Sequence, residues 1–437
     1  MTGNRFEELW LDYSNFNLVS RTISMPRWSK SDLQQAGLAS FEFLHEYAHH
    51  LQAISSGFGA ACMRGNVGRA AALAEALQKQ PDMDRPLGQW DHSAERDRHE
   101  LKIETDQFNS MLGRLTGPMT LAASVSEIDE FELTNRHYPL EHPGMHSDVV
   151  CVKRALQGRG FQVPVLAKTL CEGNAEAMAV TMTEWDSSLF GALGAETDEE
   201  TLFYTSLYGV LHKRLGGRSQ QEVAPYLAAL TDFALLFFSM DKYFLEGLQV
   251  LDEAVAGQGP QAFRMKLFEL FPEEEAITRR IDELEPLRVA LEQDNLIAAA
   301  LLECLNQVKA ALELRRAEPL FFIRGEVESG AQFRARLLDS YPATLVRIRD
   351  GVIGVGAFDD RHLERQEILD ALAHLKQYIL GGRESPECDK KHYCEFEKTI
   401  ECRMYPWRRG KVTVEGKTCV YGSIGAEIGI IGQDEAG

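Results

Sequence analysis

The segment from residue 41 to residue 52 reads FEFLHEYAHHLQ and has the spacing of an amphipathic helix. Phe41 and Leu44 begin an apolar stripe whose members recur at intervals of three and four residues, the period of one helix face. His45 and His49 lie beside that stripe and four positions apart, so both imidazoles project from one side of the helix, about one turn apart. The pair is therefore expected at the border between a hydrophobic core and a cleft.

The residues from His45 to His49 form the pattern H-E-x-x-H, which suits a metal ion with imidazole ligands. Zinc favours imidazole nitrogen and accepts a water molecule in its fourth position when three protein groups bind it. Glu46 adjoins the pair, where its carboxylate can take a proton from that water. The pattern predicts a zinc site with two histidine ligands and Glu46 as the catalytic base. The alternative interpretation is a surface helix whose histidines bind nothing, and a third ligand would decide between the two.

The H-E-x-x-H pattern resembles the signature of the zincin superfamily of metallopeptidases. One zincin branch needs glycine at position 52 and histidine at position 55, where this chain has Gln52 and Ser55, so that branch is excluded. The gluzincin branch takes its third ligand from a glutamate on a later helix, followed four residues on by an acid that orients a ligand histidine. The run CEGNAE is similar to that arrangement. The resemblance implies that Glu172 is the third zinc ligand and that Glu176 holds a ligand histidine.

The number of residues between His49 and Glu172 leaves the assignment of Glu172 as the third ligand open. Glu172 follows His49 by 123 positions, further than in compact gluzincins, which implies an insertion between the two helices. The other candidate third ligands are His99, Glu100, His137, His146 and Asp148. The alternative interpretation of Glu172 and Glu176 is a solvated helix face.

A gluzincin also implies a tyrosine or histidine that stabilises the oxyanion of the tetrahedral intermediate. Tyr204, Tyr208 and His212 follow at intervals of four on one expected helix, with Tyr208 as a candidate oxyanion donor. The rival donors in the preceding irregular segment are His137, Tyr138, His142 and His146. An aromatic stripe at this spacing is also typical of a helix core, so spacing alone selects none of them.

The remaining pattern predicts a mainly helical chain with a small β component, an α+β fold. The expected helices span residues 29 or 31 to 55 (with Ser29 or Ser31 as N-cap), 69–80, 164–185, 197–215, 226–240, 286–316 and 360–380. The expected strands span residues 17–25, 148–153 and 320–325. Between residues 130 and 160, prolines and glycines favour loops with only one short strand.

The length of the chain, 437 residues, exceeds one ordinary core and predicts more than one structural unit. The resemblance implies a zincin-like metallopeptidase domain over residues 1–285. A long helix over residues 286–318 is expected to connect it to a smaller C-terminal module over residues 319–437.

Half of the eight cysteines lie in the C-terminal module. They are Cys388, Cys394, Cys402 and Cys419, with His392 close by in the sequence. Four thiolates suit a structural zinc ion or an iron–sulfur cluster, although no C-x-x-C pair occurs among them. A second metal site and plain reduced cysteines are equally compatible with this spacing.

Composition and charge limit the classes of partner that the chain can bind. Apolar residues make up 44% and charged residues 26% of the chain, which is typical of a folded globular protein. The net charge of -20 argues against nucleic acid, because phosphate binding needs a basic surface. The most apolar segment, residues 226–240, is short for a membrane span and contains Asp232, so no membrane partner is expected. The start of the chain does not resemble a signal peptide, and the cysteines fit a reducing compartment.

These features together predict a cytoplasmic, zinc-dependent hydrolase. Its resemblance to gluzincins implies a metallopeptidase that acts on a protein or peptide substrate. Because a cytoplasmic protease needs restraint, a regulatory partner at the C-terminal module is a further hypothesis. The alternative is a helical regulatory or scaffold protein that keeps a metal site without catalysis. Replacement of Glu46 separates the two, because a scaffold tolerates the loss of a catalytic base.

Overall fold

The structure is a computed structural model of the whole chain. It describes residues 15–17, 21–32, 40–79, 119–121, 130–139, 146–185, 199, 201–254, 258–292, 295–341, 345–349, 351–355, 360–379, 388, 406–409, 413–414 and 417–428. Within these residues the fold is mainly helical with small β-sheets, which confirms the predicted fold class.

The helices and strands have the following bounds. The helices are α3 (Phe41–Ser55), α4 (Gly57–Lys79), α6 (Ala167–Thr183), α8 (Thr201–Arg214), α9 (Gln220–Ala234), α10 (Met240–Ala254), α11 (Pro260–Leu270), α12 (Glu273–Ala290), α13 (Leu296–Ala317), α14 (Gly330–Ser340), α15 (Asp360–Ile379), the 3-10 helix η6 (Pro406–Arg409) and α17 (Val420–Glu427). The strands are β1 (Asn15–Phe16), β2 (Ile23–Met25), β3 (Met119–Leu121), β4 (Leu133–Pro139), β5 (His146–Leu156), β6 (Arg159–Pro164), β7 (Leu345–Ile348), β8 (Gly351–Gly354), β9 (Thr413–Val414) and β10 (Lys417–Thr418).

Both ends of α3, the helix that carries H-E-x-x-H, have a physical cause. The hydroxyl of Ser40, a residue in extended conformation, accepts a hydrogen bond from the amide of Phe43 (3.2 Å) and caps the first turn. The helix stops at Ser56, whose backbone is extended, and α4 begins at Gly57. A Cβ atom at position 57 would lie 2.2 Å from the carbonyl oxygen of Leu236, so glycine permits this close approach of two backbones.

The predicted start of this helix is wrong. Ser29 caps a separate helical turn, in which its hydroxyl accepts a hydrogen bond from the amide of Asp32 (3.2 Å), and Ser31 lies within that turn. All three serines are competent N-caps, but the apolar stripe begins at Phe41, and Ser40 directly precedes it.

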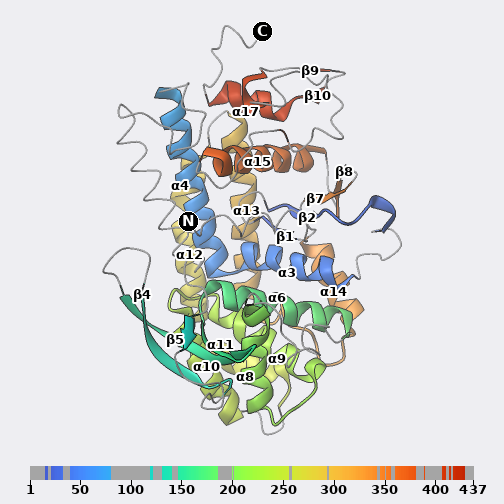
Figure 1. Cartoon of the computed structure of the whole chain (residues 1–437). Coiled ribbons are helices and arrows are strands. Elements are labelled where there is room, and N and C mark those ends of the chain that lie inside the picture. Colours follow the sequence, from blue (N-terminus) through green and yellow to red (C-terminus); the bar gives the residue numbers. More distant parts are fainter. Residues whose placement is uncertain are drawn as a thin grey trace.

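Helix α3 lies in the interior of the molecule. Figure 1 shows α3 crossing the middle, directly above α6, with α8, α9, α10 and α11 below and α15 and α17 at the opposite end. Phe43, Leu44, Tyr47 and Leu51 of α3 are buried, and α6 packs against α3 on one side and against α8 and α9 on the other. The stripe of apolar residues is therefore a core face, as predicted.

The described part of residues 130–164 contributes β4, β5 and β6 to an antiparallel sheet, which corrects the prediction of loops with one short strand. The strand order is β3-β6-β5-β4, and the predicted strand over residues 148–153 is the middle of the longer β5. Gln157 and Gly158 join β5 to β6 with φ of 49° and 76°, the geometry of a tight hairpin turn. Pro164 ends β6 and does not begin α6, which starts three residues later.

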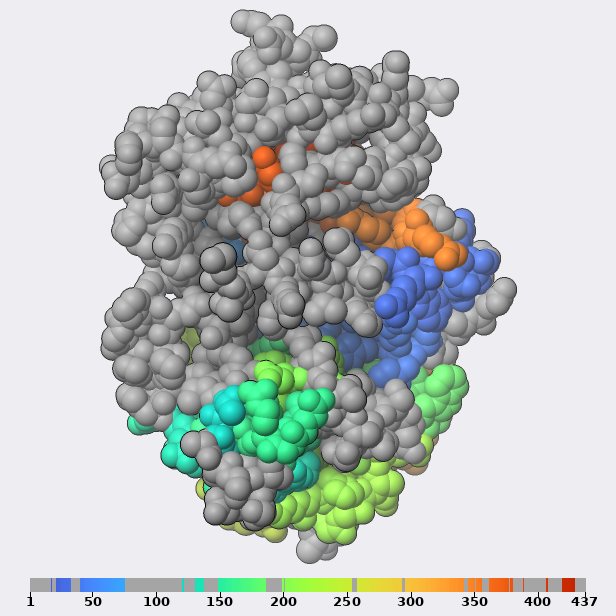
Figure 2. Space-filling model, in the orientation of Figure 1, coloured from blue at the N-terminus to red at the C-terminus, as the bar shows by residue number. Residues whose placement is uncertain are grey.

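A second sheet joins distant parts of the chain in the order β1-β2-β7-β8. β2 pairs in parallel with β7, which corresponds in Figure 2 to the blue and orange segments in contact at the right. The strand predicted over residues 17–25 is confirmed only at Ile23–Met25, because Arg21, at φ 58°, belongs to the turn between β1 and β2. Strands from both sides of the predicted domain boundary thus share one sheet, while the boundary itself stays a prediction.

Other helices agree more closely with the ranges predicted from the sequence. The helices predicted over residues 164–185, 197–215 and 360–380 correspond to α6, α8 and α15. Those predicted over residues 69–80 and 226–240 are present but begin earlier, as α4 and α9.

Two predictions around the C-terminal part are wrong. The single helix predicted over residues 286–316 is divided between α12, which contains Pro286, and α13. Asn295 caps α13, since its side chain accepts a hydrogen bond from the amide of Ala298 (2.6 Å). The segment 320–325 forms turns rather than a strand, because its apolar residues pack into the core without a pairing partner strand.

Among the described residues, no helix is both long enough and apolar enough to cross a membrane.

Candidate metal centre

Three predicted ligands meet where α3 contacts α6. His45 and His49 project from α3, and Glu172 projects from the second turn of α6. The Nε2 atoms of both histidines face the same oxygen, Oε2 of Glu172, at 3.3 Å from His45 and 3.2 Å from His49. One donor atom from each residue lies within 4.8 Å of the other two, so the group could hold a metal ion.

The distances between these atoms fit a tetrahedral ion. Zinc binds imidazole nitrogen and carboxylate oxygen at about 2.0–2.2 Å, which places two ligands of a tetrahedron about 3.4 Å apart. The measured Nε2–Oε2 separations of 3.3 and 3.2 Å are close to that value. The three side chains are only 10%, 14% and 15% exposed, and three protein ligands leave one position for water or substrate.

Each ligand histidine is also held at its Nδ1 atom. Nδ1 of His45 lies 3.1 Å from Oε2 of Glu176, which is 1% exposed, and Nδ1 of His49 lies 3.0 Å from Oε1 of Gln52. A carboxylate or amide oxygen accepts a hydrogen bond, so both Nδ1 atoms can keep their proton while Nε2 binds a metal ion. Without the ion, Oε2 of Glu172 also accepts from each Nε2. The sequence predicts this contact for Glu176 and misses it for Gln52. The available signal was its place three residues after His49, on the same helix face.

The ligands change one another's proton affinity. Burial by itself lowers the pKa of His45, yet hydrogen bonds to Glu172 and Glu176 raise that pKa well above its ordinary value. The pKa of His49 is raised too, because the charge and hydrogen bond of Glu172 outweigh burial. Burial alone would raise the pKa of Glu172, but the two imidazoles hold it well below its usual range. Glu172 is therefore an ionised carboxylate paired with positive charge, which a bound cation would also supply.

Glu46 lies beside this group on α3 and is 7% exposed. Burial raises the pKa of its carboxyl, and the nearby His45 and His49 offset part of the shift. A carboxyl that is buried, raised in pKa and electrostatically coupled to both ligand histidines can accept a proton and return it.

Of the candidate oxyanion donors on α8, the structure brings Tyr204 next to the site. Its ring centroid lies 5.6 Å from that of His45. Tyr208, the predicted donor, lies one turn further along α8, where it is 4% exposed and stacks on His212 with centroids 5.8 Å apart. Both tyrosines share one helix face, so the spacing in the sequence could not tell them apart.

Of the remaining candidates in β4 and β5, only Asp148 has a described side chain, and it belongs to no described group that could hold a metal. The backbones of His137, Tyr138 and His146 lie in β4 and β5, and their side chains are outside the described part of the chain. The candidates outside the described residues are His99, Glu100, His142, His392, Cys394 and Cys402. Cys388 and Cys419 are buried, and the second metal site at the cysteines stays a prediction.

Comparison of the chain with protein-family models, with curated proteins and with solved structures found no match. The functional interpretation therefore rests on the metal-ligand group and its surroundings.

Proposed function

We propose that this chain is a zinc-dependent hydrolase that cleaves peptide bonds in a protein or peptide substrate in the cytoplasm. The observation that carries the proposal is the convergence of the two Nε2 atoms of His45 and His49 on one oxygen of Glu172. Two imidazoles and one carboxylate form a donor set that zinc uses in catalytic sites, with one position left open. The buried Glu46 supplies the additional carboxylate that hydrolysis needs.

Each residue at the site has its own proposed role in peptide-bond hydrolysis. A bound zinc ion supplies positive charge that lowers the pKa of water and polarises a carbonyl group. Glu46 takes a proton from the attacking water and later donates it to the departing amine. Tyr204, whose ring lies beside that of His45, is the proposed donor of a hydrogen bond to the oxyanion that forms on the substrate carbonyl. The gluzincin resemblance of the sequence agrees with these roles.

The same donor set also occurs around iron(II) in oxygen-activating enzymes, so the metal has to be measured. Glu46 favours hydrolysis, because an oxygenase needs no buried general base next to its ligand histidines. Elemental mass spectrometry of the purified protein distinguishes the two: about one zinc per chain supports the proposal, and iron in its place contradicts it.

The test of catalysis is the variant Glu46→Gln, assayed with a library of quenched-fluorescence peptides as the probe. Loss of a general base lowers the rate by about 100- to 10,000-fold, so kcat should fall by that factor while the zinc content stays at the wild-type value. The matched control is Glu42→Gln, one turn earlier on α3. Its carboxylate accepts a hydrogen bond from Nε1 of Trp28 (2.7 Å), which glutamine can also accept, so its activity should equal that of the wild type.

A helical scaffold that keeps a metal without catalysis is the alternative, and the same experiment separates it. In that case the wild type would bind zinc but cleave no peptide. Peptide cleavage that persists undiminished in Glu46→Gln would reject the role of Glu46 and with it the proposed mechanism.

A further inference from the structure

The side-chain amide of Gln52 has only one possible orientation. Its Nε2 atom lies 2.9 Å from the backbone carbonyl oxygen of Cys171 on α6. A carbonyl oxygen only accepts hydrogen bonds, so the amide nitrogen has to face it. The other end of the amide, Oε1, then faces Nδ1 of His49 at 3.0 Å. The backbone of α6 thus determines which atom of Gln52 meets the histidine.

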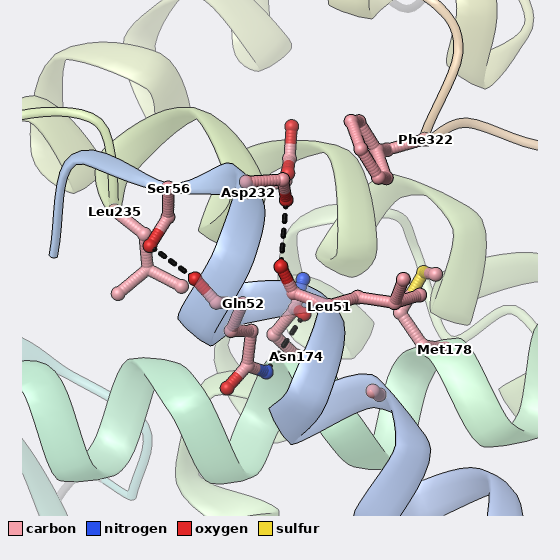
Figure 3. Close-up of a pocket in the computed structure, with 10 residues that line it drawn as sticks. Leu51, Gln52, Ser56, Asn174, Met178, Asp232, Leu235 and Phe322 are labelled. Atoms are coloured by element: carbon pink, nitrogen blue, oxygen red, sulfur yellow. Dashed lines mark hydrogen bonds between the residues drawn. The ribbon is translucent and has the colours of Figure 1, made fainter. Parts of the chain in front are cut away.

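A second amide fixes the same orientation independently. Nε2 of Gln52 also donates to Oδ1 of Asn174, at 2.9 Å. Nδ2 of Asn174 in turn donates to the backbone carbonyl of Ala228 (3.1 Å) and to the hydroxyl of Thr231 (2.9 Å) on α9. The carbonyl of Ala228 forces Asn174 to present its oxygen to Gln52. Figure 3 shows Gln52 and Asn174 side by side between α3 and α6.

These hydrogen bonds lie in the interior, where little water competes for their donors and acceptors. Gln52 is 7% exposed and Asn174 is 5% exposed. They line a cavity of about 10 Å³ that Asp232 and Phe322 also border (Figure 3). A buried hydrogen bond is stronger than one in water, and an unsatisfied buried donor is costly. The chain of amides from α9 through α6 to α3 therefore constrains the imidazole of His49.

We propose that Gln52 is a positioning residue for the metal centre. It holds the proton of the neutral His49 imidazole on Nδ1, and so keeps the Nε2 lone pair directed at the metal position beside Glu172. The backbone carbonyls of Cys171 and Ala228 set this tautomer through Gln52 and Asn174. The inference deepens the proposed metal site and rests on it. His45 receives the equivalent support from the carboxylate of Glu176, so the two ligand histidines are held by different chemistry.

The experiment compares wild type with Gln52→Leu and Gln52→Glu. The probe for the metal site is the zinc ion, titrated against a chromophoric chelator. Loss of an outer hydrogen-bond partner of a ligand histidine weakens metal binding by about 10- to 100-fold, and we expect that loss in Gln52→Leu. Ser55→Ala on the same helix is the control, since the Ser55 hydroxyl donates only to the carbonyl of Leu51 (2.8 Å), and its zinc affinity should be unchanged.

A spectroscopic signature distinguishes positioning from general support of the fold. The nitrogen-15 resonances of His49, identified by their absence in His49→Gln, report which ring nitrogen carries the proton. They are recorded on metal-free protein at a pH where the imidazole is neutral. Glu172 attracts the proton to Nε2 equally in all three proteins, so wild type should show a larger share of the Nδ1–H form than Gln52→Leu. Gln52→Glu should keep the wild-type share, because one carboxyl oxygen accepts from Nδ1 and the other, when protonated, donates to the carbonyl of Cys171.

Wild-type tautomer and wild-type zinc affinity in Gln52→Leu would overturn the proposal. If Gln52→Leu does not fold, a smaller share of the Nδ1–H form in Gln52→Glu than in wild type overturns it, and an equal or larger share supports it. Neither readout uses turnover. A wild type that binds zinc but cleaves no peptide therefore counts against the proposed hydrolase and leaves the role of Gln52 standing.

Discussion

Glu172 is the residue on which the metal group depends most directly. Its Oε2 atom is the only atom of the described group that faces both imidazoles, at 3.3 and 3.2 Å. Removal of this carboxylate takes away one ligand and also the negative charge that raises the pKa of His49 and His45. Two neighbouring histidines without it would tend to bind protons less readily and would offer a cation only two donors.

We predict that Glu172→Ala abolishes stoichiometric zinc binding. Two imidazoles alone do not make the three-ligand set of a catalytic zinc site. Zinc content after dialysis, measured by elemental mass spectrometry, should fall from about one per chain to near zero. Cys171→Ser is the matched control, because the Cys171 backbone carbonyl, and not its thiol, contacts Gln52. Loss of zinc in Cys171→Ser with retention in Glu172→Ala would identify the thiol as the ligand instead.

The sequence predicts most of this site at the level of single residues. The period of the helix places His45 and His49 on one face, and the resemblance of the run around Glu172 to a gluzincin helix suggests the third ligand. Gln52 was missed because an amide carries no motif of its own, and only the carbonyls of another helix give it a direction. Whether Tyr204 or Tyr208 lies next to His45 depends on how far α8 is shifted along its own axis relative to α3. The spacing of residues in the sequence carries no information about that shift.

At the level of elements, a buried cluster of charged side chains binds the C-terminal end of α3. Arg315 of α13 donates to the backbone carbonyl of Ser55 (2.8 Å) and to the carboxylate of Asp232 on α9. Arg264 of α11 lies 3.5 Å from the same carboxylate and forms a bidentate pair with Glu273 of α12 at 2.7 and 2.6 Å. The arginines and Glu273 are at most 1% exposed and Asp232 is 15% exposed, so α9, α11, α12 and α13 contribute charges to a largely buried cluster that also binds the last carbonyl of α3.

We predict that Arg315→Met destabilises the protein by about 3 kcal/mol, the low end of the cost of breaking a buried ion pair. Methionine fills much of the volume but leaves the carbonyl of Ser55 without this donor, while Asp232 keeps only its longer contact with Arg264. Urea-induced unfolding measures the change. Arg288→Met on α12 is the control, since exposed ion pairs contribute little, and its unfolding midpoint should not move. Equal midpoints for both variants would show that the buried cluster does not hold α3.

The helices that the sequence predicts well have a clear period or clear ends. The apolar period predicts α6, acidic residues at the start with Lys213 and Arg214 at the end predict α8, and the two glycines that follow predict the end of α15. The sequence does not predict the antiparallel sheet, because glycines and prolines are typical of loops as well as of hairpin turns and strand ends. Gly158 serves a hairpin turn, and Pro164 ends a strand. Asn295 is the N-cap that separates α13 from α12, and asparagine is a residue typical of that position. The sequence prediction instead begins the helix at Pro286, which lies inside α12.

At the scale of the whole molecule, the first and last parts of the described chain depend on each other. β2 pairs with β7 through Ile23 opposite Val346 and the next two residues along each strand. The hydroxyl of Tyr47, on α3, donates to the backbone carbonyl of Tyr341 (2.5 Å). α15 packs against α13 and α4, and the main hydrophobic core contains buried residues as far as Ile428. Residues beyond 318 therefore complete the core around α3.

We predict that a chain ending at residue 318 fails to fold as the full chain does. Its loss of β7 leaves the backbone of β2 exposed as an unpaired strand edge, which promotes aggregation. Its loss of α15 exposes apolar surface on α13 and α4, and Tyr47 loses its acceptor inside the core. Light scattering and urea unfolding should show association and a broad transition in place of the cooperative transition of the full chain, with weaker zinc binding. A monomeric fragment with wild-type zinc affinity would instead make residues 1–318 an independent metal domain, and the shared sheet would then be a contact between two domains rather than part of one core.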